Sequence, residues 1–534
     1  MSSRVNRRAP PSATPSYGSA RLNTGSLAGL PGRASGRRSL LILPPLAISL
    51  ALGLWGVNFG LPFLFRPDED VMVGRAVRMA AEGSLDPLFA NYPPLAFDLF
   101  ALAERAGATL GLVSLAGAAG PDPSSEYLAA RLVSVLSFVL TTVLVGLAAQ
   151  RAYSGLAGPA AALLFSVAPL AVRQAHFATT DFVQVAFLAG ALWAALRAAG
   201  WRGFAAAGAL AGLAAASKYT GGAAILPVAV LALLAPGRWR CLGAAAAAAA
   251  IAFALPGWVV LLHPGDYAGG VGFLFSRGYL HPPVLGAEPP IGIVFHPTVT
   301  LPFGLGLGAY ALALAGLAVA VWRRTPADLA LASYVFVYLA VTGAGHDVLF
   351  RYALPLLPAL AVLAGGAARL RPGLKPATAA ALLGLLALPG LYASVETDRL
   401  LATADTRQLA AQWIQDNVPE GAEIQVAYYA QPFFDQREVE ANLKLSGSRL
   451  AAGFLQGRYT SRYLVSENGG QVVVAASGPP DQGPAPAGPG LVIKAYHGRW
   501  SASVYDPLDA FYLPIWGFEG IDRPGPSLLI QTPS

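Results

Sequence analysis

Long apolar runs separated by short polar loops fill the first three quarters of the chain. Most of these runs have roughly 17–25 residues, the length that a helix needs to cross about 30 Å of hydrocarbon. The pattern predicts an all-α polytopic membrane bundle of about eleven transmembrane helices. The predicted spans are residues 39–62, 128–149, 155–171, 178–197, 203–217, 221–236, 241–262, 301–322, 328–344, 352–368 and 377–394.

The stretch 93–118 is also apolar, but Asp98, Glu104 and Arg105 make it amphipathic. If it lies at the outer interface, five of the loops predicted inside are basic and almost free of acid, as the positive-inside rule requires. If it spans the membrane, these loops move outside and break the rule. We therefore predict an interfacial segment here, a cytoplasmic amino terminus and an extracytoplasmic carboxyl terminus.

Composition agrees with a membrane protein and divides the chain into three parts. Of its 534 residues 55% are hydrophobic and 12% are charged, whereas about a quarter of a soluble chain is charged. The net charge of +7 lies mostly in an Arg-rich, Ser/Pro/Gly-rich tail, so it is no evidence for a nucleic-acid partner. The predicted domains are a disordered cytoplasmic tail at 1–38, a transmembrane domain at 39–394 and a small α/β extracytoplasmic domain at 395–534.

Within the transmembrane domain, two longer loops are predicted outside, at residues 66–127, with interfacial helices, and at 263–300. The C-terminal domain is inferred from a polar composition, a helical pattern at 406–417 and strand patterns at 423–429, 471–476 and 491–496. With this topology the polar chemistry gathers outside. That side holds all six histidines together with Asp68, Glu69, Asp70, Arg173, Asp181, Lys218, Asp347 and Arg351.

Three acids, Asp68, Glu69 and Asp70, follow Pro67 in the first outer loop. Proline at the first turn and carboxylates at the positive end of the helix dipole make a good helix start, which is a sufficient structural explanation. The functional interpretation is a carboxylate that acts as general base for an acceptor hydroxyl at the membrane surface. The residues alone leave both interpretations open.

Cations recur at the outer ends of three spans, at Arg173, Lys218 and Arg351. Arginine forks and lysine point charges both suit a phosphate, and a lysine inside an apolar stretch usually faces a cavity or a partner. Snorkelling side chains are the structural alternative, particularly for Arg173. The histidines of the 263–300 loop match no standard ligand spacing, so no metal site is predicted. No cofactor is required, and a divalent cation is unsupported.

These residues resemble, in order, the motifs of a known superfamily, that of the protein O-mannosyltransferases and aminoarabinose (lipid A) transferases. The resemblance extends over roughly residues 40–530. The superfamily includes bacterial phospholipid-carrier-dependent glycosyltransferases. The Trp-Trp-Asp signature of oligosaccharyltransferases is absent, which argues against that branch. The matching motifs are Pro67-Asp68-Glu69, Tyr92-Pro93-Pro94-Leu95, Arg173 to Asp181, Lys218-Tyr219-Thr220-Gly221, Arg351 to Pro355, Thr406 to Gly421 and Phe511 to Pro526.

The resemblance implies a GT-C fold and inverting transfer of a sugar from a polyprenyl or dolichyl monophosphate. It implies Asp68 as the base, Glu69 as an aid to acceptor or donor placement, and Lys218, Arg351 and Arg173 as contacts of the carrier phosphate. Further candidate substrate contacts are Tyr92, His176, Asp181, Tyr219, His346 and Tyr352. The implied partners are the sugar donor, membrane lipids and an acceptor glycan, lipid or protein, and the expected location is a bacterial inner membrane.

Two other functions fit a polytopic chain. One is a transporter or flippase of lipid-linked sugars without transferase activity, although the sequence shows no internal repeat of the kind that many transporters have. The other is a membrane anchor that presents residues 395–534 to envelope partners, which would leave Asp68, Lys218 and Arg351 without a role. The sequence names neither the sugar nor the acceptor.

Overall fold

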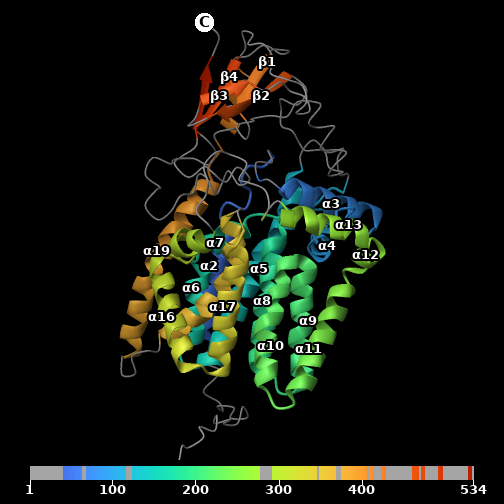
Figure 1. Ribbon diagram of the computed structural model, residues 1–534. Coiled ribbons are helices and arrows are strands. Elements are labelled where there is room, and N and C mark those ends of the chain that lie inside the picture. Colours follow the sequence, from blue (N-terminus) through green and yellow to red (C-terminus); the bar gives the residue numbers. More distant parts are fainter. Residues whose placement is uncertain are drawn as a thin grey trace, which may run out of the picture.

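The computed structural model describes residues 40–62, 66, 68–115, 123–276, 279, 292–345, 348–368, 375–405, 408, 409, 412, 413, 416 and the backbone of five strands beyond residue 422. The predicted tail at 1–38, the candidate His346 and the motif Phe511 to Pro526 lie outside the described residues, as does most of Thr406 to Gly421. The described part up to residue 405 is almost entirely helical (Figure 1).

The first half of the described chain consists mainly of helices. They are η1 (Leu40–Ile42), α2 (Leu43–Leu54), α3 (Glu69–Glu82), α4 (Leu95–Thr109), α5 (Ser124–Tyr153), α6 (Ala157–Ser166), α7 (Pro169–Ala175), α8 (Thr180–Arg197), α9 (Trp201–Ser217), η3 (Tyr219–Ala224) and α10 (Ile225–Leu234). Helices of the second half complete the bundle. They are α11 (Arg238–Ala254), α12 (Trp258–Leu262), α13 (Pro264–Phe275), α14 (Gly292–Phe295), η5 (His296–Thr300), α15 (Leu301–Leu305), α16 (Leu307–Arg323), α17 (Pro326–Gly343), η6 (Phe350–Leu356), α18 (Leu357–Ala367) and α19 (Pro376–Leu401).

Every apolar segment predicted to span contains helix. By length and composition, four helical stretches among the described residues could cross a membrane, and several apolar helices are shorter. The four are Ser124–Tyr153, Pro326–Gly343, Phe350–Ala367 and Ala377–Leu401. The shorter helices arise partly where a predicted span is interrupted, as between α6 and α7 and between η3 and α10.

The outer faces of the bundle are apolar. On α11, Trp239, Ile251 and Leu255 are each more than 60% exposed, and Trp322 on α16 is 84% exposed. Scattered exposed leucines are normal in soluble proteins, but large apolar side chains along successive exposed helix faces are not. These surfaces suit contact with lipid, in agreement with the predicted membrane domain.

Small residues let α9 and α11 approach closely. A Cβ atom added at Gly208 would lie 2.1 Å from the carbonyl oxygen of Ala245, and one added at Gly212 would lie 2.2 Å from that of Ala249. Two glycines four residues apart on one face are a common device for packing helices in membranes, where lipid provides no hydrophobic drive between them. The seam fixes α9, whose C-terminal end leads to Lys218.

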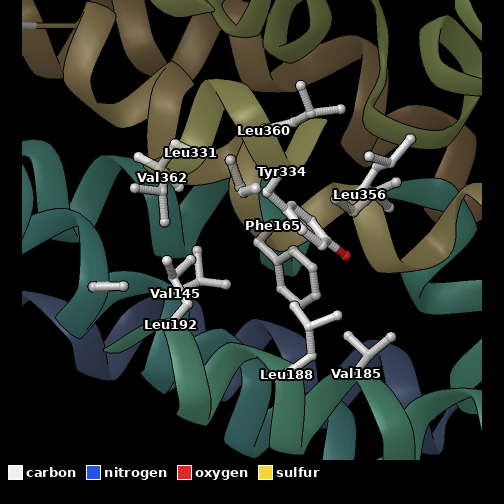
Figure 2. Close-up of a cluster of buried hydrophobic side chains, with 14 of the residues drawn as sticks. Val145, Phe165, Val185, Leu188, Leu192, Leu331, Tyr334, Leu356, Leu360 and Val362 are labelled. Atoms are coloured by element: carbon white, nitrogen blue, oxygen red, sulfur yellow. The ribbon is translucent and has the colours of Figure 1, made fainter. Parts of the chain in front are cut away.

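A dry core holds the middle of the bundle together. Figure 2 shows part of it, where Phe165 of α6 lies among residues of α5, α8, α17, η6 and α18. Tyr334 adds a polar group to this core (Figure 2). Its hydroxyl donates a hydrogen bond of 3.0 Å to the carbonyl of Pro355. This bond satisfies the buried hydroxyl and braces the 3₁₀ turn η6, which carries Arg351.

A second, smaller core lies under α3 and α4. It includes Met72 and Val73 of α3, Phe97 and Phe100 of α4, and Tyr127 of α5. Figure 1 shows α3 lying across one end of the bundle, with α4 and α13 near it. In this core α4 packs on α3 and ends at Thr109, and the interfacial position of residues 93–118 stays a prediction.

The described strands after residue 422 form one five-stranded sheet with the order β3-β2-β1-β4-β5. The strands are β1 (Glu423–Ala427), β2 (Thr460–Glu467), β3 (Gln471–Val474), β4 (Leu491–Tyr496) and β5 (Ser527–Gln531). The central strand β1 runs parallel to β2 and β4, and the outer pairs β2–β3 and β4–β5 are antiparallel. The sequence pattern predicted β1, β3 and β4 but missed β2 and β5.

Candidate active site

Asp68 stands at the amino end of α3 in a left-handed backbone conformation, with φ at 69°. Aspartate tolerates this region better than most residues, but outside glycine it still carries strain. The carboxylate Oδ2 accepts a hydrogen bond of 3.0 Å from Nη2 of Arg351, which lies 283 positions later in η6. The Asp68 side chain is 44% exposed and that of Arg351 is 9% exposed. Asp68 therefore presents an accessible carboxylate beside a largely buried cation.

The adjacent acid, Glu69, has the opposite environment. Both of its carboxylate oxygens accept bonds of 2.7 Å from the guanidinium of Arg131, and Oε1 also accepts the backbone N–H of Ala178 at 2.8 Å. Both side chains of this pair are 1% exposed. In this conformation Glu69 cannot reach a substrate, and it instead ties the start of α3 to α5 and to the segment before α8.

Asp70, the third acid of the motif, lies in the first turn of α3. Burial, together with the negative charges of Asp68 and Glu69 and against the effect of backbone hydrogen bonds, raises its pKa to about 6. Its carboxyl group therefore exchanges a proton close to neutral pH. No role was predicted for Asp70.

Lys218 lies between α9 and η3, where its extended backbone interrupts the apolar hairpin. Its Nζ donates a hydrogen bond of 2.7 Å to Oδ1 of Asp181 in the first turn of α8. The same Nζ lies 5.6 Å from the ring centre of Tyr92 and 6.0 Å from that of Tyr352, within range of a cation–π attraction. The lysine and its acid are 11% and 5% exposed.

These two ion pairs share one site. Arg351 interacts electrostatically with Asp181 as well as with Asp68, and the phenol of Tyr92 interacts with all four charged groups. The structure thus brings together side chains from five elements that are far apart in the sequence. The predicted site residues gathered here are Asp68, Tyr92, Asp181, Lys218, Arg351 and Tyr352.

Other predicted site residues lie in the protein interior. Arg173 is fully buried in α7. His176, at the end of α7, is also fully buried, with Nδ1 2.8 Å from the carbonyl oxygen of Val172 and Nε2 2.8 Å from that of Trp55. These contacts link the end of α7 to the end of α2, so His176 has a structural role in the bundle. Tyr219 follows Lys218 but joins a different group of polar atoms, described below.

The sequence analysis missed Arg131, the partner of Glu69. Besides the carboxylate, its Nη1 donates to the carbonyls of Val57 and Phe59, at 2.8 and 2.9 Å. One signal was present, because an arginine inside the predicted span 128–149 is costly in lipid unless it has partners. Among the described residues, no group of three or more His, Cys, Asp or Glu could hold a metal ion.

Residues 124–263 match the family model of dolichyl-phosphate-mannose-protein mannosyltransferases. The match extends from the start of α5 to the residue after α12, and it includes Asp181 and Lys218 but neither Asp68 nor Arg351. No curated protein matches the chain in a sequence search.

Solved structures of glycosyltransferases resemble the fold. ArnT from Cupriavidus metallidurans bound to undecaprenyl phosphate has 18% sequence identity and a TM-score of 0.50, over 72% of this chain and 73% of that one. The oligosaccharyltransferase AglB from Archaeoglobus fulgidus, with an inhibitory peptide and a dolichol-phosphate, has 14% identity and a TM-score of 0.49, over 79% and 65%. The Pmt1-Pmt2 complex of S. cerevisiae bound to the sugar donor has 19% identity and a TM-score of 0.30, over 47% and 34%. This chain therefore matches the mannosyltransferase family model over residues 124–263 and resembles ArnT in its fold.

Proposed function

We propose that the protein is an integral membrane glycosyltransferase that moves a sugar from a polyprenyl monophosphate to an acceptor hydroxyl at the extracytoplasmic face. The observation that carries the proposal is the pairing of an accessible carboxylate, Asp68, with the largely buried cation Arg351, next to the Lys218–Asp181 pair. Acid and cations in one site suit a reaction that removes a proton from one oxygen and leaves negative charge on another.

In the proposed reaction, the Asp68 carboxylate takes the proton of the acceptor hydroxyl as its oxygen forms a bond to the anomeric carbon of the sugar. The bond from that carbon to the phosphate oxygen breaks, and the carrier phosphate leaves with the electron pair. Lys218 and Arg351 stabilise its charge. Attack opposite the leaving phosphate inverts the anomeric centre. Tyr92 and Tyr352 border Lys218 and help to exclude water from the cation.

The lipid carrier is inferred from two observations. Arg351 contacts Asp68 at the start of α3 and Lys218 lies beside Tyr92, and α3 crosses one end of the bundle (Figure 1), which is where the phosphate of a membrane-anchored lipid would meet the protein. ArnT, which shares the fold, has been solved with undecaprenyl phosphate bound, and this supports a polyprenyl carrier here. Glu69 acts as a positioning residue because it is buried against Arg131, and Arg173 and His176 support the site from the interior.

The remaining predictions belong to the same proposal. The chain crosses a bacterial inner membrane eleven times, with the amino terminus in the cytoplasm, and residues 395–534 form a small α/β domain outside. The acceptor is a glycan, lipid or protein, and the reaction requires no resident cofactor. Residues 1–38 form a basic cytoplasmic tail.

The base is tested with Asp68→Asn in the purified full chain, supplied with polyprenyl-phosphate sugars and an extract of envelope acceptors. Loss of a general base lowers the transfer rate by about 10²- to 10⁴-fold. Asparagine also tolerates the left-handed backbone, so the fold is retained. Glu82→Gln, at the exposed far end of α3, is the matched control and retains the parental rate. Transfer by Asp68→Asn at the parental rate would exclude Asp68 as the base.

The role of Lys218 is tested through its ion pair with Asp181. Lys218→Met leaves Asp181 buried without a counter-ion, so it loses both stability and affinity for polyprenyl monophosphate. The double variant Asp181→Asn/Lys218→Met recovers the melting temperature, because it also removes the unpaired charge of Asp181, but not the affinity for phosphate. If the double variant regains both, Lys218 acts only through stability. Movement of lipid-linked sugar across vesicles without transfer would favour the transporter instead.

A further inference from the structure

Three buried oxygen atoms next to the site have no hydrogen-bond partner in the described part of the chain. They are Oδ1 of Asp98 on α4, the hydroxyl of Tyr219 on η3 and the hydroxyl of Tyr267 on α13. Tyr267 is only 4% exposed as a residue. Buried polar atoms of this kind are uncommon, since leaving a donor or acceptor unsatisfied costs more than a made hydrogen bond gains.

The three groups belong to one place in the fold. The Tyr267 hydroxyl interacts electrostatically first with Asp86 and then with Tyr219 and Asp98, although Asp98, Tyr219 and Tyr267 come from separate elements. One turn after Tyr267, a Cβ atom at Gly270 would lie 2.3 Å from the carbonyl oxygen of Ala90. Helix α13 is therefore seated directly on the segment that leads into Tyr92, a member of the candidate site.

Within the described residues, few side chains of α13 are buried. Tyr267 and Gly270 are its buried residues, whereas Val271, Phe273 and Phe275 are between 42% and 54% exposed. The Tyr267 phenol is therefore buried while large apolar groups of the same helix are exposed, and its hydroxyl finds no acceptor among the described residues. This arrangement is expected of a group that meets a ligand rather than of one that packs a core.

We propose that Asp98, Tyr219 and Tyr267 bind the hydroxyl groups of the sugar that the lipid carrier brings. The proposal rests on the proposed function, because Tyr219 directly follows Lys218, the residue assigned to the phosphate that bears this sugar. A carboxyl group and two phenols can donate and accept hydrogen bonds with a ring of hydroxyls, and the aromatic rings add apolar surface for its C–H groups.

The chemistry favours a sugar over a second phosphate. No cation is among the three groups, and an ionised Asp98 would repel an anion. Burial raises the pKa of Asp98 to about 7. Near neutral pH the Asp98 carboxyl group is therefore protonated in a fraction of the molecules, where it can donate as well as accept a hydrogen bond. A sugar hydroxyl uses both properties.

The test compares the affinity of the purified full chain for bare polyprenyl monophosphate with its affinity for the same carrier bearing mannose, glucose, galactose or arabinose. The parental protein is expected to bind at least one glycosylated carrier more tightly than the bare one. Tyr267→Phe removes one oxygen atom and should lower that preference about fivefold, the contribution of one neutral hydrogen bond. Asp98→Ala should lower it at least as much, and neither variant should change affinity for the bare carrier.

Tyr310→Phe is the matched control, because the Tyr310 hydroxyl already donates to the carbonyl of Pro297 at 2.8 Å. It should leave the preference unchanged. If Tyr267→Phe keeps the full preference, its hydroxyl contacts only water and the subsite is excluded. If it alters the Michaelis constant for the acceptor alone, the donor assignment is wrong. Failure of the parental protein to bind even the bare carrier would count against the proposed function itself.

Discussion

The two ends of the helix bundle each hold an aspartate beside an arginine, and the two pairs differ in how completely they are satisfied. At the end where α16 meets α17, Asp328 accepts bonds from the guanidinium of Arg323, from the hydroxyl and N–H of Thr325, and from the hydroxyl of Tyr153. At the opposite end, the hydrogen bond described for Asp68 comes from Arg351 alone, and nearly half of its side chain is exposed.

The difference separates a structural ion pair from one available to a ligand. Asp328 closes a capping box at the start of α17 and uses both oxygens on the protein itself, so it has little capacity left. Asp68 keeps an exposed carboxylate, and Nε of its partner Arg351 has no partner among the described residues. Charged groups that the protein satisfies only in part are candidates for contact with a bound molecule.

The largest expected effect tests the framework behind Asp68. Arg131→Met leaves the Glu69 carboxylate buried without its counter-ion, and removing one partner of such a pair costs about 3–5 kcal/mol. We expect little folded protein in size-exclusion chromatography and a much lower melting temperature. The double variant Glu69→Gln/Arg131→Met should recover most of the stability. Normal folding of Arg131→Met would mean that the pair does not hold α3 in place.

A smaller effect tests the comparison itself. Asp328→Asn should lower stability by about 1–2 kcal/mol, because Arg323 is 40% exposed and can bind water once the charge is lost. The transfer rate per folded molecule should stay within about twofold of the parental rate. Asp68→Asn should show the reverse pattern, a large loss of rate at a nearly unchanged melting temperature. If Asp328→Asn lost as much transfer rate as Asp68→Asn, the two ends of the bundle would act together.

The smallest effect concerns a buried acid on α4. Burial, and secondarily the charge of Glu126, raises the pKa of Glu104 from 4.5 to about 9. A raised folded-state pKa means that the folded protein holds this proton more tightly, so the stability it contributes is lost as the pH rises from about 4.5 through 9. Glu104→Gln resembles the protonated acid, and its melting temperature should fall less between pH 5 and pH 8, by on the order of a few degrees. An identical pH profile in both proteins would contradict the raised pKa.

The sequence predicted the helical segments of the bundle well because hydrophobic length alone determines them in a membrane. It placed Asp68, Lys218 and Arg351 together through charge on one predicted face and through motif order. The partners were harder to find. No spacing rule connects Glu69 to Arg131 or Lys218 to Asp181, since these contacts depend on how distant helices pack. Strands β2 and β5 were missed because their sequences lack clear alternation of apolar and polar residues.

The sequence also could not tell which of two adjacent acids would be accessible. Asp68 and Glu69 have the same charge and almost the same position in the motif. The left-handed turn at Asp68 points successive side chains in different directions, so one carboxylate enters the core and the other remains at the surface. This separation depends on a backbone angle, which charge patterns do not report.

The long sequence separation between Asp68 and Arg351 has a consequence for biogenesis. The ribosome delivers the aspartate early, whereas its guanidinium partner emerges 283 residues later, after most of the predicted spans have entered the bilayer. A nascent chain that stops between α8 and α17 would carry the carboxylate, and in most cases the lysine, but never the arginine that completes their electrostatic environment. Maturation of the site is thereby coupled to nearly complete insertion, so that partly made chains are chemically silent.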